Sequence, residues 1–211
     1  MNIRIDSRSI ALLAIFAAMV IALEIIPIPL LTDIPLFAGF TFDPTGIPIT
    51  LIFLMLGSVF GLILIPIMWI SIAYRNLIGS IFKGFAEFYT LLGLIVAKMI
   101  LKKRSYDWKV ALPTYVAFGV VFRVVLMYVS NIFLIQWLYM APPEVALALS
   151  ASFVLPNFIQ AIVNVLIGIL IFIIIPENLL IEGRLGKYGY DGDRIYEEIS
   201  EDESELSSDN D

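Results

Sequence analysis

The residues most able to do chemistry in this chain are polar side chains that interrupt long apolar stretches. Arg123, Met127 and Asn131 are spaced four residues apart, so on a helix they share one face, with Tyr128 beside them. A polar group inside a membrane segment is costly, which makes each one a candidate for function. We expect this face to present hydrogen-bonding groups to a small molecule, while pairing with a carboxylate is the alternative role for Arg123.

A second polar face follows on the last apolar stretch. Asn157, Gln160 and Asn164 are spaced by three and four residues and also share one side of a helix. Two such faces at similar depth would enclose a cavity suited to a flat molecule rich in heteroatoms. The alternative is that the amides only join helices through interhelical hydrogen bonds.

Charged residues at the ends of apolar stretches form a third group. Lys83 and Glu87 are spaced i, i+4, where opposite charges reach one another on a helix. The spacing predicts a self-neutralised pair near the membrane interface, and a proton or ion relay is the functional alternative. Glu24 comes at the end of the first apolar stretch and is expected at the outer interface.

The residue types that are missing exclude several kinds of chemistry. The chain has no cysteine and no histidine, which removes disulfides, thiolate metal sites, and the commonest metal ligand and neutral-pH base. It also has no P-loop motif, so it does not hydrolyse ATP itself. We therefore expect no catalytic residue, no metal site and no cofactor of its own, and predict that the chain is not an enzyme.

Composition places the chain in a membrane. Apolar residues make up 60% of the 211 residues, charged residues 15%, and the mean hydropathy is +0.95, against about 45–50% apolar and about 25% charged in soluble domains. The net charge of −6 comes from residues 191–211, which hold ten acidic residues and one arginine. Residues 1–180 are predicted to form a transmembrane domain, and 181–211 an acidic, disordered cytoplasmic tail that is either simply solvated or a docking segment.

The apolar pattern predicts an all-α bundle of six transmembrane helices. Proline and glycine punctuate the pattern, and the loop at residues 27–46 is apolar enough to fold over the bundle as a lid. Proline is expected to bend the third helix at Pro66 and to interrupt the sixth at Pro156. The expected helices cover residues 9–26, 47–56, 59–73, 78–101, 110–138 and 145–175.

The basic residues set the expected orientation. With six helices drawn, ten lysines and arginines lie on one side and only Arg75 and Lys83 on the other, with Arg123 inside the fifth helix. Basic residues favour the cytoplasmic side. We expect a multi-pass protein of the plasma membrane with both termini in the cytoplasm. The ten are Arg4, Arg8, Lys98, Lys102, Lys103, Arg104, Lys109, Arg184, Lys187 and Arg194.

Small residues follow one side of the first helix. Ala14, Ala18 and Ala22 are four residues apart and form a ridge that allows close approach of another backbone. The ridge serves either internal packing or docking of a partner membrane protein.

The order of several short motifs resembles the S components of energy-coupling factor (ECF) vitamin importers, and most closely their riboflavin-binding branch. The similarity covers about residues 8–175. The chain differs from that branch at position 160, where Gln replaces Lys, at Thr45-Gly46 and at Ser58. The motifs are Ile26-Pro27-Ile28-Pro29, Phe42-Asp43-Pro44-Thr45-Gly46-Ile47-Pro48, Leu56-Gly57-Ser58-Val59-Phe60-Gly61, Arg123 to Asn131, and Pro156-Asn157-Phe158-Ile159-Gln160.

The resemblance implies a six-helix subunit that captures a water-soluble vitamin, such as riboflavin, from outside. Its partners would be a membrane scaffold subunit, facing the alanine ridge, and two cytoplasmic ATPase subunits that use ATP. The loop before the second helix would gate the pocket, with Phe42 and Asp43 beside the ligand and Asn131, Asn157 and Gln160 in contact with it. No nucleic-acid partner is expected.

Two other classes of function remain as alternatives. An intramembrane enzyme acting on lipids needs clustered carboxylates or a metal motif, and Glu24 and Glu87 are far apart in sequence. A non-catalytic assembly subunit would use the amides for packing alone.

Overall fold

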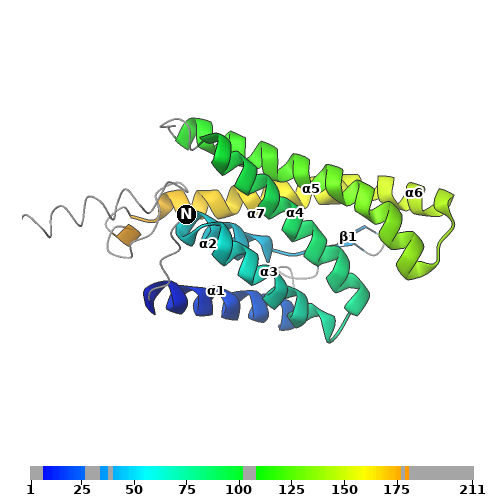
Figure 1. Ribbon diagram of the computed structural model, residues 1–211, viewed down its shortest axis with the longest axis horizontal. Coiled ribbons are helices and arrows are strands. Elements are labelled where there is room, and N and C mark those ends of the chain that lie inside the picture. Colours follow the sequence, from blue (N-terminus) through cyan, green and yellow to red (C-terminus); the bar gives the residue numbers. More distant parts are fainter. Residues whose placement is uncertain (1–6, 27–33, 38–39, 102–107, 177–178, 181–211) are drawn as a thin grey trace, which may run out of the picture.

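The computed structural model describes residues 7–26, 34–37, 40–101, 108–176 and 179–180 of the chain. Its helices run mostly along the long axis of an elongated bundle (Figure 1). The start and end of every helix expected from the sequence lie within two residues of a helix bound in the structure. The helices are α1 (Ser7–Ile25), α2 (Gly46–Leu56), α3 (Ser58–Ala73), α4 (Leu77–Leu101), α5 (Trp108–Tyr139), α6 (Pro143–Ser152) and α7 (Val154–Ile174).

The short helix α2 lies in the middle of the bundle. Eight of its eleven residues are buried, so nearly every side of it faces protein. It packs against α7 and α3, while α4 packs against α5 and α3, and α1 against α3. A helix enclosed in this way has no polar face, which explains its continuous apolar sequence.

Two glycines allow the chain to turn and the helices to approach. Gly57 separates α2 from α3 with φ of 97°, a left-handed conformation that other residues rarely adopt. At Gly93, a Cβ atom would lie 2.3 Å from the backbone oxygen of Phe118. The backbones of α4 and α5 therefore touch at a point where only glycine fits.

A small hairpin precedes α2 and is an addition to the expected all-α fold. Strands β1 (Ile34–Phe37) and β2 (Phe40–Phe42) pair antiparallel, with Ile34 opposite Phe42. The hairpin lies in the stretch expected to form a lid, and β2 lies against α7. The rest of that stretch, residues 27–33 and 38–39, is outside the described residues.

The expected sixth helix is broken three residues earlier than predicted. The interruption falls at Phe153, between α6 and α7, rather than at Pro156. Pro156 instead lies in the first turn of α7, where a proline is tolerated because its missing N–H would have no helical partner.

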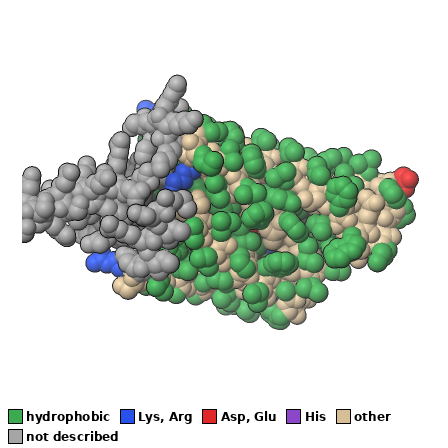
Figure 2. Space-filling view, viewed as in Figure 1, with side chains coloured by type: hydrophobic (Ala, Val, Ile, Leu, Met, Phe, Trp, Pro, Cys, Tyr) green, Lys and Arg blue, Asp and Glu red, His purple; other side chains and the backbone are tan. Residues whose placement is uncertain are grey.

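The described part of the chain has the dimensions of a membrane protein. Four helical stretches are long and apolar enough to cross a bilayer: Ser7–Ile25, Leu77–Leu101, Trp108–Tyr139 and Pro143–Ile174. Figure 2 shows hydrophobic side chains over the visible flank, with lysine and arginine side chains toward the end where α1 begins. The helices α2 and α3 are shorter, and the acidic tail lies outside the described residues.

Candidate functional site

A cavity of ≈ 700 Å³ opens among the helices at one end of the bundle. The ends of α1, α3 and α5 and the beginnings of α4 and α7 surround it, because these helices alternate in direction. Small-molecule pockets typically measure about 300–1,000 Å³ and combine apolar walls with a few polar groups. The cavity is therefore large enough for a small ligand.

The polar face expected on α5 does line this cavity. Arg123, Met127 and Asn131 are all buried and all contribute to the wall. Tyr128, one residue further round the helix, is only half-buried and does not belong to the lining. The four-residue spacing therefore identifies the residues of α5 that face the cavity.

The polar face on α7 divides between the cavity and the core. Asn157 and Gln160 line the cavity, whereas Asn164 lies below it and is completely buried. A Cβ atom on Gly46 would lie 2.4 Å from Asn164 Nδ2, so α2 passes directly over this side chain. Neither amide atom of Asn164 has a hydrogen-bond partner among the described residues.

Arg123 is fixed by an ion pair inside the bundle. Its Nη1 lies 2.6 Å from Glu87 Oε1 on α4 and 3.3 Å from Thr90 Oγ1. Its Nε donates to Asn157 Oδ1 at 3.1 Å. Pairing with a carboxylate, the alternative considered for Arg123, is therefore what the structure has.

The predicted pair between Lys83 and Glu87 is wrong. Lys83 contacts Glu24 on α1 and Asp43 before α2, the latter at 2.6 Å. Glu87 is committed to Arg123 instead. An i, i+4 pair on a helix surface is worth only a few tenths of a kcal/mol, so this spacing alone does not determine the partner.

Glu24 also differs from its expected place at the interface. Its side chain is only 3% exposed and contacts Lys83, with Arg75 Nη2 at 3.7 Å. The Thr45 hydroxyl lies 2.6 Å from Glu24 Oε1 and within hydrogen-bond distance of Asp43, so it joins the two carboxylates. Lys83 Nζ donates to the same hydroxyl oxygen at 3.2 Å.

Asp43 is held ionised at the entrance to α2. Burial alone would raise the pKa of its carboxyl group, but the Lys83 ammonium and hydrogen bonds from Thr45 hold the pKa below its ordinary value of 3.8. Gln160 Nε2 donates to the Asp43 backbone oxygen at 3.3 Å, which attaches this segment to α7. Asp43, Lys83 and Gln160 thus form one connected wall.

The charges around the cavity balance. Three carboxylates, Glu24, Asp43 and Glu87, face three cations, Arg75, Lys83 and Arg123. Among the described residues no group of three His, Cys, Asp or Glu side chains is arranged to hold a metal ion. Glu24 and Asp43 do lie together, but both are engaged by Lys83, so the arrangement offers polar recognition rather than a free acid or base.

Sequence reasoning missed several residues of the cavity lining. The sequence pattern places Glu24 and Lys83 near the interface and Arg75 only among the basic residues of the outer side, although a charge within or beside an apolar helix is itself a signal for a buried site. The aromatic residues Phe82, Tyr139 and Phe153 carry no such signal, because aromatic side chains occur throughout the chain. Of Phe42, only its place in β2 is described.

The alanine ridge of α1 lies on the outside of the bundle. Ala14 and Ala18 are exposed and Ala22 is half-buried, while Phe16, Val20 and Glu24 face inward. Internal packing therefore does not account for Ala14 and Ala18. The ridge remains available to a membrane neighbour.

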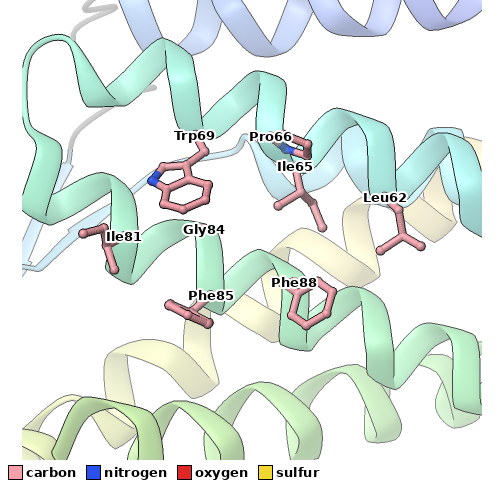
Figure 3. Close-up of a pocket in the computed structure, with 8 residues that line it drawn as sticks. All are labelled: Leu62, Ile65, Pro66, Trp69, Ile81, Gly84, Phe85 and Phe88. Carbon is pink, nitrogen blue, oxygen red and sulfur yellow. The ribbon is translucent and has the colours of Figure 1, made fainter. Parts of the chain in front are cut away.

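A second, smaller cavity of ≈ 270 Å³ lies between α3 and α4 (Figure 3). Trp69 extends from α3 over Gly84 of α4, and its indole Nε1 donates to Ser80 Oγ at 2.9 Å. The lining bears no charged group, so it lacks the convergent polar groups of the larger cavity. It consists of Leu62, Ile65, Pro66, Trp69, Ile81, Gly84, Phe85 and Phe88.

Fold and cavity together define a helical protein with the dimensions of a membrane protein and a polar pocket at one end. In comparisons with known proteins, no family model, no curated protein and no solved structure matches the chain.

Proposed function

We propose that this chain is the substrate-binding membrane subunit, or S component, of an ECF-type importer, and that it captures a water-soluble vitamin such as riboflavin. The observation that carries the proposal is the cavity of ≈ 700 Å³ at one end of the bundle, with Arg123, Asn131, Asn157 and Gln160 in its wall. A pocket of this size with a few convergent polar groups suits a small heteroaromatic molecule.

The distribution of charge supports binding from outside. Arg8 lies in the first turn of α1, Lys98 near the end of α4 and Lys109 near the start of α5. All three are at the end of the bundle away from the cavity. Basic residues favour the cytoplasmic side of a membrane. In this orientation six passes place both termini in the cytoplasm, and the hairpin before α2 acts as a lid at the outer end.

The exposed alanine ridge supports a partner in the membrane. In this proposal Ala14, Ala18 and Ala22 contact the scaffold subunit, which carries two cytoplasmic ATPase subunits. Small residues allow the close approach on which helix association in lipid depends. ATP would be used by the partners and not by this chain.

The first experiment is purification of the full-length protein in detergent, with absorbance and mass spectrometry of whatever co-purifies. We expect a yellow preparation that releases riboflavin at near one per chain. A colourless preparation carrying another vitamin would support the importer function but show that the substrate is not riboflavin. An empty preparation that no vitamin stabilises against heat would contradict the proposal and favour an assembly subunit.

An Asn131→Leu variant distinguishes a ligand contact from helix packing. If Asn131 binds ligand, the variant remains folded and loses binding. If the amide only joins helices, the variant loses thermal stability instead. A variant that folds and binds like the wild-type protein would remove Asn131 from the site.

A further inference from the structure

The wall that α5 gives to the cavity contains an unpaired hydrogen-bond acceptor. Asn131 is 2% exposed and lines the cavity, and its Oδ1 has no partner among the described residues. A buried polar atom without a partner is unfavourable, because it has lost its hydrogen bonds to water. A ligand that donates an N–H or O–H group to this oxygen would remove that cost.

The same wall contains an unpaired donor at greater depth. Arg123 uses Nε for Asn157, and Nη1 for Glu87 and Thr90. Within the described part of the chain, no side chain accepts the N–H groups of Nη2, although Arg123 lines the cavity. The guanidinium therefore has one edge left for an acceptor on a ligand.

The two residues lie at different depths along α5. Arg123 and Asn131 are eight residues apart on α5, which corresponds to about 12 Å along the helix axis. Because α5 ends at Tyr139 beside the cavity, Asn131 lies nearer the end of the bundle. The buried side chain of Met127 lies between them and offers an apolar surface.

The cavity has no charge left over for an ionic ligand. Arg123 is neutralised by Glu87, and the two cations Lys83 and Arg75 balance the two carboxylates Glu24 and Asp43. An additional ion in such a site would lose its hydration without gaining a counterion, which is strongly unfavourable. This excludes ligands that carry a phosphate or a carboxylate.

We infer that the ligand is an uncharged molecule with an acceptor at its inner end for Arg123 Nη2 and a donor at its outer end for Asn131 Oδ1. The inference rests on the proposed function and specifies its substrate class. It predicts that the site binds uncharged, unphosphorylated vitamins and does not bind their charged or phosphorylated forms.

Matched pairs of probes test the charge. The purified full-length protein is titrated with riboflavin and riboflavin phosphate, pyridoxine and pyridoxine phosphate, and nicotinamide and nicotinate, by calorimetry. We expect the uncharged member of one pair to bind about 100-fold more tightly than its charged partner, equivalent to two tenfold steps in Kd. If a charged member binds as tightly or more tightly, the inference is overturned and the importer stands. If no member of any pair binds, the inference is overturned, and the vitamin that does or does not co-purify with the protein decides whether the proposed function stands.

Two variants test the polar ends with the probe that binds. Arg123→Lys keeps a cation beside Glu87 but lacks Nη2, and Asn131→Leu removes the acceptor. Each should weaken binding by about tenfold or more in a protein that remains folded, although Arg123→Lys also loses the Nε hydrogen bond to Asn157. Val125→Ala, at an exposed position of α5, is the control. Folded variants that bind as tightly as the control would overturn the assignment of these two groups.

Discussion

Lys83 Nζ lies 2.6 Å from Asp43 Oδ2, which joins the start of α4 to the segment that leads into α2. The same ammonium contacts Glu24 at the end of α1. Three stretches that are distant in sequence therefore meet at one cation, beside the cavity. This arrangement makes Lys83 a structural connection as well as part of the wall.

Replacing Lys83 with methionine should strongly destabilise the protein. The change leaves Glu24 and Asp43 buried without their cation, and breaking a buried ion pair by removing one partner costs about 3–5 kcal/mol. Thermal unfolding of the purified protein measures the effect. Lys109→Met, at an exposed position at the other end of the bundle, is the control.

Adding Asp43→Asn to Lys83→Met should restore part of the lost stability, because the carboxylate that is ion-paired with Lys83 then no longer carries an uncompensated charge. A Lys83→Met protein as stable as the Lys109→Met control would show that the ion pairs around Lys83 contribute nothing to the fold.

The contribution of Asp43 should depend on pH in a defined direction. Because the pKa of Asp43 in the folded protein lies below its ordinary value of 3.8, its ionised form stabilises the fold above that value, and the stabilisation is lost as pH falls through the lower folded pKa. The difference in Tm between the wild-type protein and Asp43→Asn should be constant from about pH 5 to about pH 7 and shrink below about pH 4. Glu24 and Lys83 are present in both proteins. A difference that grows on acidification would contradict this.

The pair of Arg123 and Glu87 should show strong coupling. Arg123→Met leaves a buried carboxylate, and Glu87→Gln leaves a buried guanidinium, so each change alone should cost about 3–5 kcal/mol. The double variant removes both charges and should be more stable than the two single effects predict when added, with a coupling of about 0.5–3 kcal/mol. Unfolding of all four proteins completes the cycle. Additive effects would mean that the two side chains do not pair.

Sequence pattern was sufficient where the determining information is local. Helix bounds follow from apolar runs ended by Pro or Gly, and the inward face of α5 follows from the spacing of Arg123, Met127 and Asn131. The partner of Lys83 did not follow, because Glu87 is its neighbour on the helix whereas Asp43 is brought to it only by packing. Proline position likewise failed to locate the break at Phe153.

The close approach of α4 and α5 can be tested at Gly93, with Gly84, which lies on the same helix but faces α3, as the control. A Cβ atom at Gly93 would lie 2.3 Å from a backbone oxygen of α5, so Gly93→Ala forces the helices apart and should cost about 1–3 kcal/mol. At Gly84 the nearest atom, in the Trp69 ring, is 3.6 Å away. Gly84→Ala should therefore be tolerated, or stabilise the helix by about 0.5–1 kcal/mol. Equal effects of the two changes on Tm would contradict the close approach at Gly93.

The alanine ridge on α1 should matter for assembly and not for folding. Ala14 and Ala18 are exposed, so the double change Ala14→Leu with Ala18→Leu should alter thermal stability by no more than about 0.5 kcal/mol and leave ligand affinity unchanged. The larger side chains would keep a neighbouring helix from close approach. Under the proposed importer function, uptake by cells and co-purification with a scaffold subunit should both fall. Ala148→Leu, at an exposed position of α6, should leave both unchanged, since α6 lies at the other end of the bundle from the start of α1. Normal uptake by the Ala14→Leu, Ala18→Leu protein would place the partner on another face.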